Sequence, residues 1–204
     1  MIYSRPMISH ISSIVADSLN VKKSYFAENA EQVERAAQMI AECFNAGGKL
    51  LLLGNGGSSA DAQHIAGEFV NRFCVENRRA LPAVALSTDG GVLTCIANDT
   101  GFEKIFARQI EGLGKSGDVC LAISTSGKSP NVVAAVEQAR SQGMKTIGLL
   151  GRDGGMVAPL CDLALIVPSN DTQRVQETHN LIGHIICELV EMTLFPEEIS
   201  GKER

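Results

Sequence analysis

The sequence predicts one α/β domain, a three-layer α/β/α sandwich whose middle layer is a five-stranded parallel sheet. Three observations support this prediction. Five short runs rich in Leu, Ile and Val follow residue 48, and they lack the strict polar alternation of a half-exposed strand. Helix-like segments separate these runs, and a loop rich in Gly, Ser, Thr, Asp or Asn follows each of them.

Amphipathic helices are expected before the sheet. Apolar side chains recur there at spacings of three and four residues, first around Ile11 and Ile14 and later around Val33 and Ile40. This pattern predicts two helices within about residues 7–46, ahead of the first strand.

The remaining elements follow from the apolar pattern and the loops that interrupt it. Strands are predicted at residues 49–54, 82–87, 118–124, 145–151 and 162–168. Helices are predicted over residues 57–73, as a pair within 89–111, over 130–142, near 154–160 and over about 172–194. The chain is thus divided into N-terminal helices over residues 1–46 and an α/β core over 47–196, within one domain spanning 1–204.

Composition narrows the possible partners and the compartment. Eighteen Lys and Arg stand against 23 Asp and Glu, giving a net charge of −5 with no basic run, so neither nucleic acid nor an anionic membrane is an expected partner. No apolar run approaches the roughly 18 residues of a membrane span, and the amino terminus has no apolar signal core. The six cysteines are scattered singly, mostly in apolar stretches, which suits reduced thiols in a cytoplasmic protein.

Ligands of a parallel α/β sheet bind outside the carboxyl ends of its strands. The loops at that edge are GNGGSS (54–59), STDGG (87–91), STSGKS (124–129), GRDGG (151–155) and PSNDTQ (168–173). Each has ordinary turn composition, so no single loop is specific for a ligand.

The glycine-rich loop after the first strand partly matches a dinucleotide fingerprint. Gly54 and Gly56 fit the pattern, but Ser59 replaces the third glycine, and no Gly-Lys-Ser/Thr follows to make a phosphate-binding Walker loop. Ser58 and Asp61 are spaced as a capping box, so the helix start can face a polar or anionic ligand. A capped turn without a ligand is the alternative.

The serine-rich loop after the third strand is more specific. Pro130 suits the first position of a helix, and Ser129 suits its N-cap. One serine would be enough for the cap, whereas the loop also carries Ser124, Thr125 and Ser126. Hydroxyl groups beside helix N-terminal amides are good donors to phosphate oxygens, so this loop predicts a phosphate site.

Two pairs of potential metal ligands lie on separate predicted helices. His64 and Glu68 are four residues apart, and Gln176 and His184 are eight apart in the last helix. Imidazole and carboxylate groups are competent zinc ligands, whereas two solvated helix faces are the alternative that spacing alone favours. The other histidines, His10 and His179, are expected at the surface or in packing roles.

Taken together, these motifs closely resemble the phosphoheptose isomerases, enzymes built on the sugar isomerase (SIS) domain. The resemblance rests on GNGGSSADAQHIAGEF (54–69), the A-N-D of residues 97–99, STSGKS, and Q-E-x-H-x-x-x-x-H (176–184). It implies a flavodoxin-like SIS fold. It also implies conversion of sedoheptulose 7-phosphate to D-glycero-D-manno-heptose 7-phosphate, the first step toward ADP- or GDP-heptose for lipopolysaccharide core or other surface glycans.

The resemblance further implies a cytoplasmic homotetramer with one zinc ion per subunit, active sites at subunit interfaces and packing of the N-terminal helices in the oligomer. The implied zinc ligands are His64, Glu68, Gln176 and His184. The implied substrate contacts are Asn55, Gly56, Gly57, Glu68, Asn98, Asp99, Ser124, Thr125, Ser126, Ser129 and Gln176. Glu68 and His184 are the implied proton-transfer groups, as an aldose–ketose isomerisation through an enediol requires.

Two related classes are the rivals of an isomerase. One is a non-enzymatic SIS module that binds a replication initiator, and the other is a regulatory sugar-phosphate sensor. The full set of acid/base and metal-binding residues, Glu68 and His184 included, favours the enzyme. Sensors usually carry a DNA-binding domain, for which this chain has no room.

Overall fold

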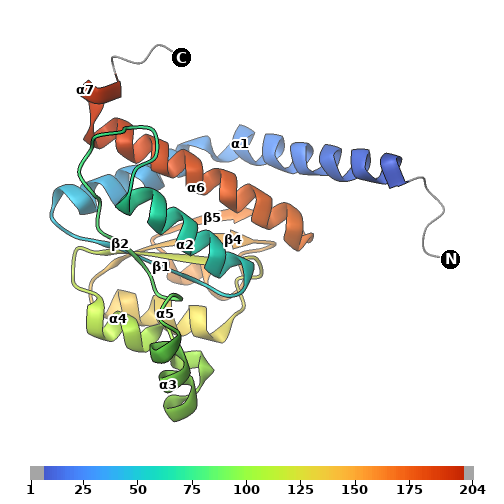
Figure 1. The fold of residues 1–204 in the computed structure, drawn as a ribbon. Helices are drawn as coiled ribbons and strands as arrows, with labels where there is room; N and C mark the ends of the chain where they lie inside the picture. Colours follow the sequence, from blue (N-terminus) through green and yellow to red (C-terminus); the bar gives the residue numbers. More distant parts are fainter. Residues whose placement is uncertain (1–6, 200–204) are drawn as a thin grey trace.

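The computed structural model describes residues 7–199 and confirms the predicted parallel sheet (Figure 1). Residues 1–6 and 200–204, the ends of the predicted domain, lie outside the described part. The strands are β1 (Leu50–Gly54), β2 (Ala83–Ala85), β3 (Val119–Ser124), β4 (Lys145–Gly151) and β5 (Leu163–Val167). All pairings are parallel, in the order β2-β1-β3-β4-β5. This order is that of a flavodoxin-like sheet.

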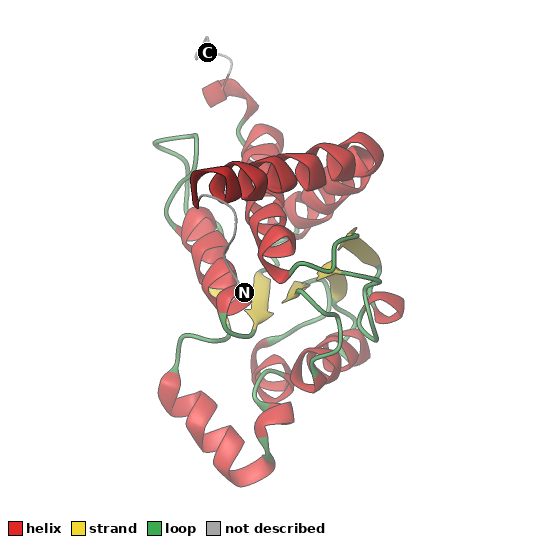
Figure 2. Cartoon of the chain, turned by 90° about the vertical axis from the view of Figure 1, so that its right-hand side faces the viewer, coloured by secondary structure: helices red, strands yellow, loops and turns green. Residues whose placement is uncertain are grey.

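Helices lie on both sides of the strands, as Figure 2 shows. One side is covered by α1 (Met7–Asn45), α2 (Gly57–Val70) and α6 (Thr172–Leu194). The other side is covered by α4 (Ala107–Leu113) and α5 (Pro130–Ser141), and the short helix η1 (Phe102–Lys104) packs beside α5. Three more elements complete the described chain: α3 (Gly90–Thr100), η2 (Ala158–Leu160) and α7 (Pro196–Ile199). Alternate side chains of the buried strands fill the two cores, as a sheet covered on both faces requires.

The N-terminal region corrects one prediction, because α1 is a single helix of 39 residues where two were expected. The apolar pattern weakens between its two halves, but neither Gly nor Pro occurs within α1 to stop it. Its buried residues all lie between Tyr25 and Phe44, where it packs alongside α6. The N-terminal half of α1 extends beyond the rest of the molecule (Figure 1).

A buried ion pair fixes the loop between α2 and β2. The Glu191 carboxylate of α6 accepts hydrogen bonds from the amides of Phe73, Cys74 and Val75 and from Arg78 Nε. Both charged side chains are fully buried. Burial alone would raise the pKa of Glu191, but these four donors hold it below its usual value. Removing either partner would leave a buried charge uncompensated, which is strongly destabilising.

His179 is a core residue, the packing role rather than the surface role of the two that were expected. It is fully buried in α6, and its Nε2 lies 2.9 Å from the Leu150 carbonyl oxygen, whereas Nδ1 has no partner within the described chain. Burial lowers its pKa to about 4, with the Leu150 hydrogen bond opposing the shift. The folded protein therefore keeps His179 neutral at pH values where the unfolded chain would protonate it.

This difference predicts a pH-dependent stability. Because the folded pKa of His179 lies below the ordinary 6.5, the unfolded state binds more protons between pH 6.5 and 4, and stability is lost as the pH falls through that window. The contribution is at most about 3 kcal/mol. We expect His179→Gln to flatten this part of the pH profile of the unfolding free energy, measured by urea denaturation with a chelator present.

The exposed histidine of α1 supplies the control for that measurement. His10→Gln should leave the slope of the wild-type profile in place. Equal slopes for the wild type and His179→Gln between pH 4 and 6.5 would contradict the assignment.

Candidate active site

A small pocket lined mainly by hydroxyl groups lies at the carboxyl end of β3. Its lining residues are Asn55, Ser58, Ile123, Ser124, Thr125, Ser126 and Ser129. Its volume of about 70 Å³ corresponds to roughly two water molecules, so it can accept a phosphate-sized group but no whole sugar. The structure thus brings together the predicted serine loop and the first glycine-rich loop.

The start of α5 partly bears out the predicted cap. Pro130 is the first helical residue and Ser129 occupies the N-cap position, but the Ser129 hydroxyl makes no capping hydrogen bond. That hydroxyl lines the pocket instead. Loop closure requires glycine at position 127, because φ is +62° and a Cβ would lie 2.0 Å from the Gly154 carbonyl oxygen.

Asn131 lies behind Asn55 at this pocket, and the sequence reasoning missed it. Its side-chain amide exchanges two hydrogen bonds of 2.8 Å with the amide of Asn55. Asn131 is buried, so the pair holds Asn55 in a fixed orientation at the rim of the pocket. A signal was available, because Asn131 shares its helical face with the apolar Ala135 and Ala139, and a polar side chain there needs a partner.

The predicted capping box at the start of α2 is wrong. The helix begins at Gly57 with Gly56 as N-cap, and no side chain caps it. Ser58 is buried in the pocket wall, and the carboxylate of Asp61 accepts a 3.0 Å hydrogen bond from Gln176 Nε2. Backbone bonds within the turn take the place of the cap, since the Ser58 amide donates to the Asn55 carbonyl oxygen. Sequence spacing did not reveal this pairing of Asp61 with a residue of α6.

Two histidines and a carboxylate converge where α2 meets α6. The Nε2 atoms of His64 and His184 are 2.7 Å apart, and His64 Nε2 lies 3.6 Å from Glu68 Oε1. One potential ligand atom from each of these side chains lies within 4.8 Å of the others. Gly183 permits this approach, because a Cβ there would come within 2.7 Å of Ile65 Cδ1.

Gln176, the fourth predicted ligand, lies two turns before His184 on α6. Its side chain packs against Gly57, where it leaves no room for a Cβ, and donates to Asp61. The side-chain amide is thereby held with its nitrogen toward Asp61. Its participation in metal binding stays a prediction.

Asn98 and Asp99 lie apart from the hydroxyl-lined pocket. Both are exposed on α3, where Asn98 Nδ2 donates to Asp99 Oδ1 over 2.8 Å, and neither lines that pocket. None of the residues of α3 is buried, and the helix projects from the body of the molecule (Figure 1). The predicted substrate contacts of these two residues therefore stay a prediction.

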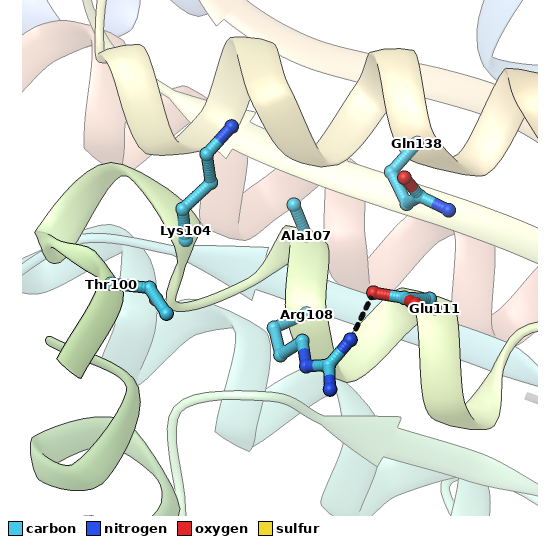
Figure 3. A pocket seen from close by; sticks show the side chains of 6 residues that line it. All are labelled: Thr100, Lys104, Ala107, Arg108, Glu111 and Gln138. Atoms are coloured by element: carbon cyan, nitrogen blue, oxygen red, sulfur yellow. Dashed lines mark hydrogen bonds and ion pairs between the residues drawn. The ribbon is translucent and has the colours of Figure 1, made fainter.

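A second hollow lies on the side of the sheet away from α2 and α6. Its walls come from α3, η1, α4 and α5, and its lining residues are Thr100, Lys104, Ala107, Arg108, Glu111 and Gln138 (Figure 3). Along the α4 wall, Arg108 pairs with Glu111, three residues later on the same helix, at 2.7 Å. The hollow holds none of the residues predicted for the site.

Comparison with known proteins identifies the family of the chain. The SIS domain model matches residues 15–151. The phosphoheptose isomerase of Trichlorobacter lovleyi is 53% identical over 189 residues, covering 93% of this chain and 96% of the relative. That of Pelobacter propionicus is 59% identical over 162 residues, covering 79% and 85%.

Solved structures of such enzymes superpose closely on the chain. The phosphoheptose isomerase of Neisseria gonorrhoeae has a TM-score of 0.86 at 40% identity, covering 91% of this chain and 99% of that structure. The enzyme of Francisella tularensis has a TM-score of 0.89 at 36% identity, covering 92% and 100%. The chain therefore belongs to the SIS-domain family of phosphoheptose isomerases.

Proposed function

We propose that the chain isomerises sedoheptulose 7-phosphate to D-glycero-D-manno-heptose 7-phosphate, the first step toward ADP- or GDP-heptose for lipopolysaccharide core or other surface glycans. One observation carries the proposal. In this chain, which belongs to the family, the turn after β1 lines the hydroxyl pocket. The helix that follows the turn presents His64 and Glu68 toward His184. Phosphate recognition and acid/base chemistry are thus joined by one segment.

The phosphate of the substrate would bind in the hydroxyl-lined pocket. Ser124, Thr125, Ser126 and Ser129 offer neutral donors there, beside the N-terminal end of α5. The chain has a net charge of −5 and no basic run, but this site needs no arginine cluster. Hydroxyl groups and helix amides can bind phosphate without one. Asn55, Gly56 and Gly57 would then contact the sugar as it extends toward α2, with Asn98 and Asp99 as further contacts.

The isomerisation moves a proton between C1 and C2 of the sugar through an enediol. Glu68 would take the proton from one carbon and return it to the other, and His184 would exchange a proton with the sugar oxygens. These roles are supported by the geometry, because a carboxylate oxygen of Glu68 and a ring nitrogen of His184 lie within 4.8 Å of each other. Groups in such a cluster can reach neighbouring atoms of one substrate.

The same cluster fits a zinc ion. Two imidazole nitrogens and one carboxylate oxygen form a donor set that zinc prefers, and an amide oxygen from Gln176 would complete four ligands. We assign one zinc ion per subunit to His64, Glu68, Gln176 and His184, and we propose that ligation by Glu68 and His184 loosens when the sugar binds, because a firmly zinc-bound group is a weaker base. Bound there, zinc would polarise the sugar carbonyl and stabilise negative charge on the enediol oxygens. Gln176 would have to turn its amide oxygen toward the cluster while Asp61 holds its nitrogen.

The assembly we propose is a homotetramer with active sites at subunit interfaces. The N-terminal half of α1 exposes an apolar stripe formed by Met7, Ile8, Ile11, Ile14, Val15 and Leu19. Such a stripe is unusual on a monomer surface and suits a helix–helix contact between subunits. Helix α3 also lacks buried residues. Asn98 and Asp99 of one subunit could therefore reach the active site of a neighbouring subunit.

The expected compartment is the cytoplasm. All six cysteines are free and several are buried, which suits a reducing environment. Among the described residues, no helix is long and apolar enough to cross a membrane. We propose neither a nucleic acid nor a membrane as a partner.

A conservative change at Glu68 tests the proposed chemistry. Glu68→Gln keeps the size of the side chain and removes its basicity, so we expect kcat for sedoheptulose 7-phosphate to fall by about 10²–10⁴-fold. The KM should change little, because the phosphate pocket is intact. Steady-state assays would use Glu76→Gln as the matched control, since Glu76 is exposed. Near-normal turnover by Glu68→Gln would remove it from the mechanism.

Charges on the α1 stripe test the proposed assembly. Ile11→Asp combined with Val15→Asp places two carboxylates in the apolar stripe, and we expect a smaller oligomer by light scattering together with lower activity. The control, Ala16→Asp combined with Asn20→Asp, puts the same charges on the opposite, exposed face of the helix. A tetramer that survives the first change unaltered would count against the stripe as an interface.

A further inference from the structure

We propose that Phe73 is a positioning residue for this reaction, because its ring holds the His184 imidazole in the orientation that the site needs. The Arg78–Glu191 ion pair in turn holds Phe73. The inference rests on the proposed role of His184 as zinc ligand and proton-transfer group. It concerns a residue outside the predicted site, on a loop without regular secondary structure.

The His184 ring is bounded by two other rings. Phe73 stacks on one side, with ring centroids 5.5 Å apart and planes inclined by 29°. His64 lies edge-on, with centroids 5.0 Å apart and planes inclined by 69°. Because imidazole ligands act through one nitrogen in a fixed direction, the group that sets their ring plane tunes metal binding and proton transfer. Phe73 is placed to do this by aromatic packing rather than by a hydrogen bond.

The position of Phe73 is itself fixed by α6. The Phe73 amide donates to Glu191 Oε1 over 2.8 Å, and Glu191 lies seven residues after His184, two turns along the same helix. One helix thus carries the imidazole and also the carboxylate that anchors the stacking ring. Movement of the loop relative to His184 would require breaking hydrogen bonds to a buried charge.

The Arg78–Glu191 ion pair also contacts the backbone of α2, the helix that carries Glu68. Arg78, paired with Glu191, donates through its NH2 group to the Glu68 carbonyl oxygen over 2.6 Å and through NH1 to that of Phe69 over 2.9 Å. These carbonyls belong to the last turn of α2, where helix hydrogen bonding is incomplete. The loop therefore links the backbone of Glu68 to the ring plane of His184, although these residues lie on different helices.

Substitutions at position 73 separate a stacking role from simple filling of space. Phe73→Leu keeps an apolar side chain without a ring, whereas Phe73→Tyr keeps the ring. We expect Phe73→Leu to weaken zinc binding by about 10–100-fold, measured by competition with a chromogenic chelator, and to lower kcat about as much. The KM for sedoheptulose 7-phosphate should change less than about threefold, because the phosphate pocket lies elsewhere. The separate variant Phe73→Tyr should keep the zinc affinity and kcat near their wild-type values.

Phe26→Leu is the matched control, because Phe26 is another half-buried ring on the same core that pairs with Tyr25 rather than with a site residue. It should keep the zinc affinity and kcat of the wild type. Wild-type zinc affinity and kcat in Phe73→Leu would overturn the inference, and so would a Tyr variant as impaired as the Leu variant. Failure of the wild type to bind zinc would instead overturn the proposed metal site.

Discussion

The close contact between α2 and α6 is the constraint on which the site depends. Gly183 lies against Ile65, whose Cδ1 would be only 2.7 Å from a Cβ at position 183, and the Nε2 atom of the next residue, His184, lies 2.7 Å from that of His64. At the other end of the contact, Glu191 and Arg78 tie α6 to the last turn of α2. Helices held at both ends bring His64, Glu68 and His184 from distant parts of the sequence into one cluster on rigid elements.

The two tasks of the site are carried by different kinds of structure. Phosphate recognition is assigned to a short loop between β3 and α5, where hydroxyl groups face a pocket that holds only a small group. Proton transfer and metal binding are assigned to side chains on long, packed helices. Loops can wrap an anion with many weak donors, whereas chemistry at two adjacent carbons requires positions fixed by rigid elements. The turn at Asn55–Gly57 connects the two, and Asn131 steadies it.

Much of the fold and part of the site could be predicted from the sequence, and the limits have physical causes. Uniformly apolar runs predicted every strand, since strands buried on both faces carry a strong local signal. The apolar spacings predicted two helices, whereas α1 is continuous because no helix breaker interrupts it. The capping box failed because Asp61 pairs with Gln176 on α6. Phe73 and Arg78 were missed because their roles arise only from tertiary contacts. Asn131 carried a signal, a polar side chain on an apolar helix face, but that signal does not identify its partner Asn55.

The central claim, that helix contact at Gly183 creates the proposed metal-binding cluster, can be tested most directly by measuring bound zinc in Gly183→Val. After zinc loading and gel filtration, elemental analysis should find about one zinc per chain in the wild type. The valine must displace the buried Ile65 side chain at the contact between α2 and α6, so the account predicts a content well below one in a variant that circular dichroism shows to be folded. A folded Gly183→Val protein that retains one zinc per chain with wild-type affinity would contradict it.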